Sequence, residues 1–285
     1  MKRTDFRHLE LLRVRWAEID AQGIVFNGHY LTYFDTAMSG YWRALATPYA
    51  QTMRSLGGDL FVRRATLDYR ASARYDDRLE IGMRCREFGN SSMMVDGAVF
   101  HGDLMLVQTE LIYVFADAGT QSPLRLPDAL RSLILAFEAG QSVVDVALGS
   151  WAELGDAATA IRRQVFVEEQ HIPADMEWDS ADAGCLHALA RNRFGMPLAT
   201  GRLLEHVPGV AKIGRMAVLR QMRGTQIGRQ VLEALMTEAK KQGYREVLLH
   251  AQLSAENFYL RAGFQRRGQP FEEAGIAHVE MVRTL

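Results

Sequence analysis

The feature that most limits the possible folds is a change in the spacing of apolar residues along the first half of the chain. Between residues 27 and 45, apolar side chains recur at the spacing of one helical face, with polar residues opposite. After Gly57 and Gly58 the spacing changes to two, and in RLEIGMRCRE apolar residues alternate with charged ones, as in a half-buried strand. The apolar helical set is Tyr30, Leu31, Phe34, Ala37, Met38, Tyr41, Trp42 and Leu45. This half therefore predicts one long helix followed by several antiparallel strands.

The second half has a different order of elements. A strand pattern restarts at VVDVALG, after a short helix pattern that Gly140 ends. A helical stretch DAATAIRRQVFVEEQ, a strand AKIGRMAVL, a helix GRQVLEALMTEAKKQG and a buried strand REVLLHAQ follow. This alternation is typical of an α/β unit. A chain of 285 residues is long enough for two domains, and we expect them at 1–142 and 143–285.

Composition argues against several kinds of partner. The formal net charge is −1, which gives no basic surface for nucleic acid or an anionic membrane. No apolar run approaches the length of about 18 residues that marks a membrane span, and the charged N-terminus does not resemble a signal peptide. Cys85 and Cys185 lie far apart without a CxxC spacing, which argues against a metal site or a disulfide framework. We therefore expect a cytoplasmic protein without a metal.

A carboxylate precedes the long helix in the segment WAEIDAQGIVFNGHYLTYFD. The N-terminus of a helix offers unpaired N–H groups and a partial positive charge. Hydrolysis of an activated acyl group needs a carboxylate that attacks or deprotonates water, together with donors for the developing oxyanion. Asp20 is therefore a candidate catalytic residue, with a role in the turn or as a helix cap as the structural alternative.

The same segment carries a resemblance. VRWAEIDAQGIVFNGHYLTYFDTA and ASARYDDRLEIGMRCREFGNSS look like the motifs of 4-hydroxybenzoyl-CoA thioesterase-like hotdog proteins, over about residues 5–135. The resemblance implies a long helix wrapped by an antiparallel sheet, with active sites at the interface of a homodimer or homotetramer. It places Asp20 at the catalytic carboxylate and Asn27 at the backbone N–H that polarises the thioester carbonyl. Some relatives have a histidine at the position of Asn27, which leaves open whether Asp20 works alone.

A loop between a strand and a helix is the main feature of the second half. The segment RGTQIG provides backbone N–H groups at a helix N-terminus, an arrangement that suits a pyrophosphate. The loop consists of Arg223, Gly224, Thr225, Gln226, Ile227 and Gly228.

Together with HAQLSAENFYLRAGF, this loop resembles the GNAT N-acetyltransferases, and RRQVFVEEQHIP, KIGRMAV and FEEAGIAHVEM are similar to one bacterial subgroup. The resemblance covers about residues 145–285. It implies an α/β domain with a mixed sheet that binds acetyl-CoA through this loop. The strand segment Met216, Ala217 and Val218 would pair with pantetheine, and Tyr259 would protonate the departing CoA thiolate. Gln226 departs from the family pattern, because it stands where the middle glycine of the loop is expected.

The sequence therefore predicts an α+β chain with two CoA-directed enzymes, an acyl-CoA thioesterase and an N-acetyltransferase, each acting on coenzyme A thioesters. His187, Glu169 and His278 are candidates to line the site of a small amine acceptor, although each residue type is more often structural. Three alternatives stay open: the second half binds or senses acyl-CoA without transfer, a single half is active, or the hotdog half is a binding module.

Overall fold

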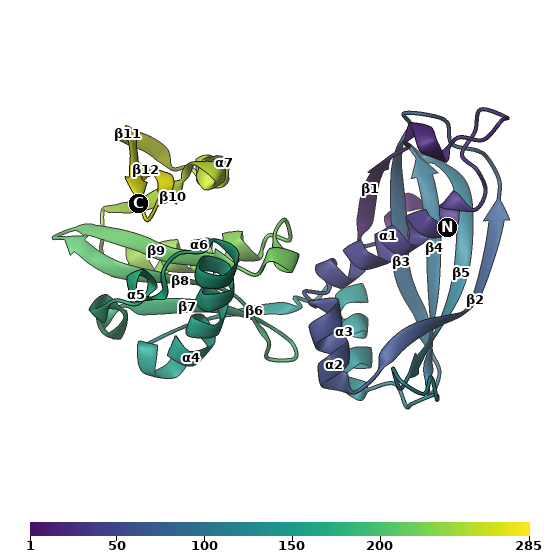
Figure 1. Ribbon diagram of the computed structural model, residues 1–285, viewed down its shortest axis with the longest axis horizontal. Helices are drawn as coiled ribbons and strands as arrows, with labels where there is room; N and C mark the ends of the chain where they lie inside the picture. The colour runs from purple at the N-terminus through teal and green to yellow at the C-terminus, as the bar shows by residue number, and fades with distance from the viewer. The chain divides into compact units, whose positions relative to one another are not determined.

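The computed structural model describes all 285 residues, and the chain forms two compact units, Met1–Val143 and Val144–Leu285 (Figure 1). Each unit has its own sheet, and no strand pairs across the boundary. No helix of the structure has both the length and the apolar character needed to cross a membrane. Cys85 and Cys185 are buried free thiols.

The first unit is a five-stranded antiparallel sheet with a long helix against it (Figure 1). The strand order is β1-β3-β4-β5-β2, so β1 and β2 are the two edges. The elements in chain order are β1 (Leu9–Arg13), α1 (His29–Ala44), α2 (Tyr49–Leu56), β2 (Asp59–Tyr69), β3 (Arg78–Phe88), β4 (Ser92–His101), β5 (Leu104–Ala116) and α3 (Asp128–Glu138). Short 3₁₀ turns lie at Arg3–Asp5 and Trp16–Glu18.

Helix α1 is buried along the face that the sequence predicts. Tyr30, Phe34 and Tyr41 are at most 2% exposed, whereas Leu31 of the predicted set is 44% exposed. The residue that caps the start of the helix is Gly28, and no side chain bonds the first turn. The helix therefore begins at His29, two residues after Asn27.

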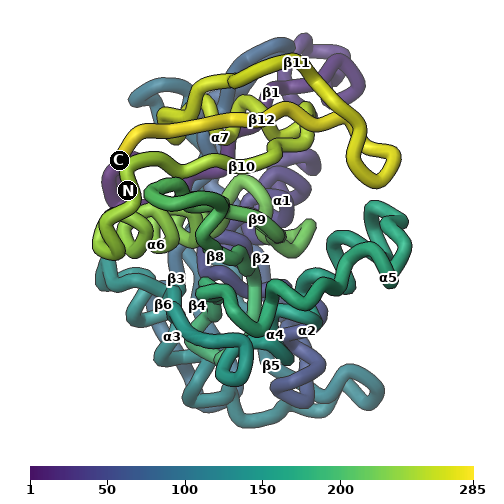
Figure 2. Tube along the Cα trace, turned by 90° about the vertical axis from the view of Figure 1, so that its left-hand side faces the viewer, coloured from purple at the N-terminus to yellow at the C-terminus, as the bar shows by residue number.

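The second unit is a seven-stranded mixed sheet in the order β11-β12-β10-β9-β8-β7-β6. Only β9 and β10 run parallel, and Figure 2 shows the terminal β11–β12 hairpin lying beside β10. Its strands are β6 (Val144–Gly149), β7 (Leu186–Asn192), β8 (Pro197–Val207), β9 (Val210–Val218), β10 (Glu246–Gln252), β11 (Gln265–Glu273) and β12 (Ile276–Thr284). Its helices are α4 (Trp151–Arg162), α5 (Ala174–Glu177), α6 (Ile227–Lys241) and α7 (Glu256–Arg261), and 3₁₀ turns lie at Ser180–Gly184, Arg220–Met222 and Leu253–Ala255.

The helical stretch predicted in DAATAIRRQVFVEEQ is correct only in part. The α-helix α4 ends at Arg162, and Arg163–Glu169 continues as a π-helical segment, η3. Val165 and Phe166 are buried on this segment. A π-helical turn is wider than an α-helical turn, and this changes which side chains face inward. Apolar spacing at the α-helical period does not predict this change.

Strands β9 and β10 separate along their length, and this separation positions the candidate site. They pair only from Val210 to Lys212 on β9, so the rest of β9 lacks a partner on that side. On its other side β9 pairs with β8 through a bulge, where Arg215 adopts the left-handed backbone conformation with a φ of 51°. A bulge bends the strand locally, which helps to open the gap next to β10.

Candidate functional sites

Asp20 lies in a tight turn before α1. Its N–H donates to the carbonyl of Ile24 at 2.9 Å, and the N–H of Gly23 donates to the carbonyl of Asp20 at 3.0 Å. Gly23 has a φ of 74°, which favours glycine. The side-chain Oδ1 of Asp20 accepts the N–H of Gln22 at 2.8 Å, while Oδ2 accepts no hydrogen bond from the chain. The turn thus fixes a half-buried carboxylate with one oxygen free.

The start of α1 provides two free donors. The N–H of His29 donates to the carbonyl of Phe26 at 2.9 Å, and the N–H of Tyr30 donates to that of Asn27 at 3.4 Å. The preceding N–H groups, those of Asn27 and Gly28, donate to no group of the chain. Unpaired N–H groups at the N-terminus of a helix favour a negatively charged or polarised oxygen.

Glu18, which sequence analysis did not single out, connects the turn to the helix. Its carboxylate is 3% exposed and accepts the hydroxyl of Tyr33 at 2.7 Å and Nε of Arg15 at 2.7 Å. Its backbone carbonyl accepts the N–H of Phe26 at 2.9 Å. Burial raises the pKa of the Glu18 carboxyl, but the hydrogen bonds from Arg15 and Tyr33 bring it below its ordinary value. Glu18 therefore stays charged and ties residues 15–26 to α1.

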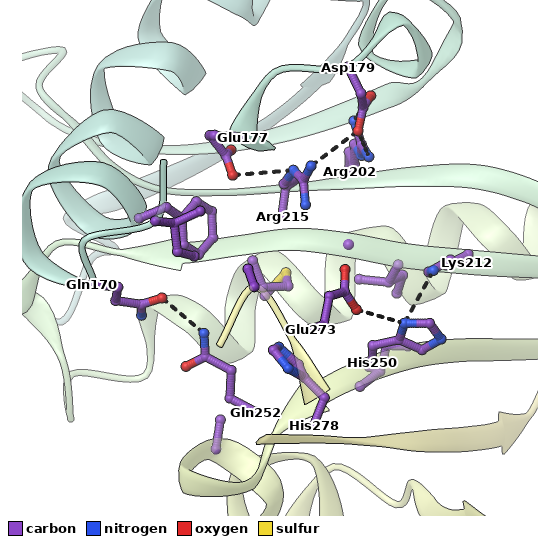
Figure 3. A pocket seen from close by; sticks show the side chains of 18 of the residues that line it. Gln170, Glu177, Asp179, Arg202, Lys212, Arg215, His250, Gln252, Glu273 and His278 are labelled. Carbon is purple, nitrogen blue, oxygen red and sulfur yellow. Dashed lines mark hydrogen bonds and ion pairs between the residues drawn. The ribbon is translucent and has the colours of Figure 1, made fainter. Parts of the chain in front are cut away.

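The second unit contains a cavity of about 390 Å³ at the opening between β9 and β10. Strand β9 contributes Lys212 to Met216, and β10 contributes Leu249, His250 and Gln252. The remaining walls come from η3 and the residues that follow it, α5, β8, α7, and the β11–β12 hairpin (Figure 3). The unpaired edge of β9 beside this cavity offers backbone groups to an extended ligand.

Loop 223–228 carries an uninterrupted row of free donors. None of the backbone N–H groups from Gly224 to Arg229 donates a hydrogen bond within the chain, and the next one, from Gln230, donates to the carbonyl of Gln226 at 3.0 Å. The first half of the row lies in the loop and the second half in the first turn of α6. Such a row at a helix N-terminus fits a phosphate or pyrophosphate group.

Two side chains of loop 223–228 have particular roles. Gln226 is exposed and has a φ of 68°, the conformation that glycine adopts most readily. Arg223 forms two bonds to the carboxylate of Glu169, at 2.7 and 2.8 Å, and a third from Nε to the carbonyl of Val218 at 3.2 Å. The bonds from Arg223 lower the pKa of the Glu169 carboxyl. Glu169 is thus paired with the loop, and it does not line the cavity.

Tyr259 of α7 lines the cavity and is 7% exposed. Its ring packs against Phe258 and Phe264, with centroid distances of 4.9 and 5.9 Å. Burial raises the pKa of its hydroxyl well above the ordinary value for tyrosine, so the group stays protonated at neutral pH. The chain provides no partner for that proton, which leaves the hydroxyl free to donate to a ligand.

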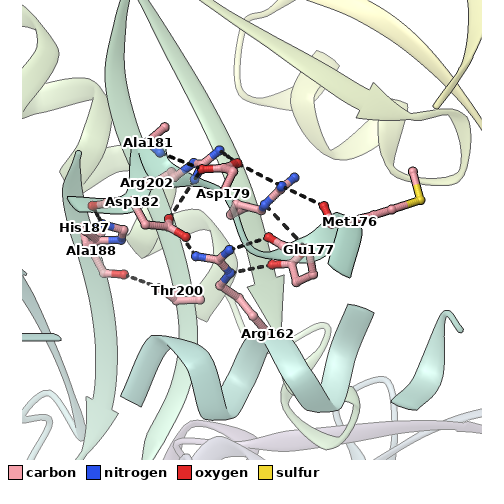
Figure 4. Close-up of polar contacts among 11 residues, drawn as sticks. Arg162, Met176, Glu177, Asp179, Ala181, Asp182, His187, Ala188, Thr200 and Arg202 are labelled. Atoms are coloured by element: carbon pink, nitrogen blue, oxygen red, sulfur yellow. Dashed lines mark hydrogen bonds and ion pairs between the residues drawn. The ribbon is translucent and has the colours of Figure 1, made fainter. Parts of the chain in front are cut away.

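A network of buried ion pairs supports one wall of the cavity (Figure 4). Arg162 is 1% exposed and bonds Glu177 through Nε at 2.5 Å and Asp182 through Nη1 at 2.8 Å. Arg202 bonds both Asp182 and Asp179 at 2.7 Å. These bonds hold α5 and the following turn against the sheet, and so fix the shape of the wall.

Of the two histidines proposed for an acceptor site, only one lies at the cavity. His278 lines it, and Nδ1 of His278 lies 2.8 Å from the carbonyl of Ile276. His187 is 1% exposed, with Nε2 at 2.9 Å from the carbonyl of Asp182 and its ring packed on Trp151. Burial lowers the pKa of His187. These contacts give His187 a structural role.

Three further side chains at the cavity lie within the quoted segments but were not singled out as site residues. Lys212, His250 and Glu273 come from β9, β10 and β11 and meet at one end of the cavity (Figure 3). Only the pairing of these strands brings them together.

Two protein families match separate parts of the chain. The Thioesterase superfamily family matches residues 22–108, and the Acetyltransferase (GNAT) domain family matches residues 164–285. Asp20 lies two residues before the first of these ranges.

Individual relatives match one half each. An uncharacterized protein of Bacillus subtilis, YyaT, is 35% identical over 131 residues, which are 45% of this chain and 87% of that protein. A putative acetyltransferase of the same strain is 34% identical over 129 residues, 44% of this chain and 86% of that protein. The solved structure of a Thermus thermophilus thioesterase, complexed with coenzyme A and Zn, is 24% identical, covers 47% of this chain and 97% of its own, and has a TM-score of 0.42.

The predicted α+β organisation, with an antiparallel sheet first and a mixed sheet second, is thus confirmed, as is the resemblance to both families. The second half of the chain belongs to the GNAT acetyltransferases, and residues 22–108 of the first half match the thioesterase superfamily.

Proposed function

We propose that the chain is a bifunctional enzyme that acts on coenzyme A thioesters. The first half hydrolyses an acyl-CoA, and the second half transfers an acetyl group from acetyl-CoA to an amine. The observation that carries the proposal is the row of free N–H groups from Gly224 to Arg229, which follows the open part of β9 in the chain. The functional domains that we propose are 1–142 and 143–285.

In the second half, loop 223–228 is the proposed cradle for the pyrophosphate of CoA. The edge of β9 at Met216, Ala217 and Val218 would hold the pantetheine arm toward the cavity. Tyr259, protonated and without a partner, would give its proton to the CoA thiolate as the carbon–sulfur bond breaks. Acetyl-CoA supplies the activated acyl group, and the fit of the free donors to its phosphates supports it as the donor.

In the first half, the free oxygen of Asp20 is the proposed nucleophile or base for the attacking water. The N–H groups of Asn27 and Gly28 would stabilise the oxyanion that forms on the thioester carbonyl. Glu18 is a positioning residue, because it bonds both the turn and α1.

A second candidate function is that the GNAT half binds or senses acyl-CoA without transfer. Two observations favour it. Gln226 holds a conformation that costs a residue with a side chain about 1–2 kcal/mol. Arg223, a potential contact for a phosphate, is already paired with Glu169. A third candidate, activity in one half alone, differs from both in the assay below.

The test measures release of the CoA thiol by the full chain, with and without amines. A panel of short and aromatic acyl-CoAs detects hydrolysis, and acetyl-CoA with primary amines detects transfer. We expect Asp20→Asn to reduce amine-independent release by at least about 10²-fold and to leave amine-dependent release intact. Tyr259→Phe should reduce amine-dependent release and leave amine-independent release intact, so each variant is the control for the other.

The outcomes separate the candidates. Hydrolysis by Asp20→Asn within about threefold of the unmodified chain would rule out Asp20 as the catalytic residue. Binding of acetyl-CoA without any amine-dependent release would favour the sensing function, and loss of both activities in one variant would contradict two independent sites.

A further inference from the structure

The cavity of the GNAT half has a polar end whose chemistry no residue of the proposed CoA site uses. At this end His250 of β10 has Nδ1 3.5 Å from Nζ of Lys212 on β9 and 3.2 Å from Oε2 of Glu273 on β11 (Figure 3). The His250 side chain is 28% exposed, and all three residues line the cavity. One imidazole nitrogen thus lies between a cation and an anion.

These two neighbours favour opposite states of the same nitrogen. A lysine ammonium can only donate, so it stabilises the lone pair of neutral Nδ1. A carboxylate can only accept, so Glu273 stabilises Nδ1 once it carries a proton. A general base must be stable both before and after it takes up a proton. Lys212 is the partner of neutral Nδ1, and Glu273 is the partner of protonated Nδ1.

The other nitrogen of His250 also has a defined environment. Nε2 lies 3.9 Å from the Glu280 carboxylate on β12, which suits a protonated Nε2 in both states. Glu280 is itself bonded by Arg267 of β11, and this bond lowers the pKa of Glu280. The neutral tautomer that these neighbours favour carries its proton on Nε2 and leaves the lone pair on Nδ1, the nitrogen that faces Lys212 and Glu273.

The remaining neighbours of His250 add no further charge next to it. The ring of Phe271 packs edge-on against His250 at a centroid distance of 4.9 Å and stacks on His278 on the other side. His278 is turned to the carbonyl of Ile276, and His206 of β8 acts on Glu280. Lys212, Glu273 and Glu280 are therefore the charged side chains that face the two ring nitrogens of His250.

We propose that this end of the cavity binds the acceptor as a primary aliphatic ammonium ion, and that Nδ1 of His250 removes its proton. The proposal rests on the proposed acetyl transfer. Glu273 attracts the ammonium group, since its one partner in the chain is His250 and its side chain is 50% exposed. Acceptor deprotonation and proton donation by Tyr259 thus take place in one cavity.

One N–H bond of the ammonium breaks, and its proton moves to Nδ1, which makes His250 an imidazolium. The freed electron pair of the amine forms the C–N bond to the thioester carbonyl carbon, and the C–S bond breaks. Tyr259 protonates the departing thiolate, and the second proton lost by the nitrogen as the amide forms returns to the Tyr259 phenolate. His250 releases its proton to solvent.

The test is the pH profile of kcat/KM at saturating acetyl-CoA, with the best acceptor from n-butylamine, benzylamine and lysine. In His250→Gln, the rise of kcat/KM with pH that reports deprotonation of the base should disappear. Its kcat/KM should fall at least about 10²-fold. Lys212→Met removes a cation and should move that rise to higher pH, whereas Glu273→Gln removes an anion and should move it to lower pH. His101→Gln, which changes a histidine of the first unit, should leave the profile unchanged.

A second measurement does not depend on turnover. In the full chain with labelled histidines, NMR titration should show the His250 midpoint rising in Lys212→Met and falling in Glu273→Gln. Unshifted midpoints, or an unchanged rise with pH in His250→Gln, would overturn the proposal while acetyl transfer itself stands. Absence of transfer by the unmodified chain would overturn the proposed function and the acceptor site with it.

Discussion

Gln226 is a single residue whose backbone conformation is unfavourable for its side chain. With a φ of 68° it sits where a residue with a Cβ loses about 1–2 kcal/mol, and its exposed side chain forms no contact that offsets this cost. We expect Gln226→Gly to raise the free energy of unfolding by about 1 kcal/mol, despite the greater freedom of glycine in the unfolded chain. Urea unfolding measures the change.

Gln230 provides the matched control for the stability of Gln226→Gly. It lies inside α6, where glycine costs about 1 kcal/mol relative to a good helix former, so Gln230→Gly should destabilise the chain.

Gln226→Gly also tests binding of CoA. Because backbone N–H groups supply the cradle, Gln226→Gly should change CoA affinity by less than about tenfold. Binding that appears only after this substitution would mean that the natural second half has lost its ligand.

Asp179 gives a prediction about pH. Hydrogen bonds from Arg202 lower the pKa of Asp179 to about 2, against about 3.9 in an unfolded chain. A group with a lowered pKa contributes stability above its unfolded pKa and loses it as the pH falls through the folded pKa. Asp179→Asn should therefore have a lower free energy of unfolding than the unmodified chain near pH 6. This difference in the free energy of unfolding should become smaller between about pH 4 and pH 2.

Urea unfolding across this pH range tests the prediction. Asp175→Asn is the control, because Asp175 is an exposed acid of the same segment and forms no ion pair. The role given to the ion pair of Asp179 and Arg202 would be contradicted by one result. That result is a difference in the free energy of unfolding, between Asp179→Asn and the unmodified chain, that stays constant down to pH 2.

Strand β2 is the element whose environment is incomplete within one chain. It is an edge strand of eleven residues, and Val62 and Tyr69 are 55% and 49% exposed. An unpaired edge of this length favours pairing with another strand. We therefore expect two copies to pair through β2, giving a particle of about 64 kDa, twice the 32.1 kDa of one chain.

Light scattering at micromolar concentration measures this mass. Val62→Glu should weaken the dimer, while Leu104→Glu, equally exposed at the start of β5, should not. A monomer for the unmodified chain would contradict pairing through β2, and it would also weaken the thioesterase proposal, in which both chains complete each site.

The elements also show which parts of the fold a sequence pattern can predict. The helical face of α1 and the alternation of Leu79, Ile81 and Met83 on β3 are confirmed because burial on one face leaves a clear period. Strand β2 was not assigned, since an exposed edge lacks that alternation. At Arg163–Glu169 apolar spacing predicts an ordinary α-helix where the structure has a π-helical segment, because both kinds of helix are apolar on one side.

The candidate sites also include residues that a sequence motif marks and residues that only the fold brings together. Tyr259 and loop 223–228 can be proposed from the sequence because each lies within a contiguous motif that one element positions. Glu18 was missed because a buried acid looks like a surface acid in a sequence. Lys212 and Glu273 were missed because they lie 61 residues apart in the numbering and meet only through the pairing of three strands.

In the whole molecule, two units with separate sheets carry two families that act on the same kind of ligand. The central claim is that each half binds coenzyme A at its own site. Isothermal titration of the full chain with CoA tests it most directly. We predict uptake of one CoA by each half, so two per chain. Uptake of a single CoA, or of none, would contradict the account.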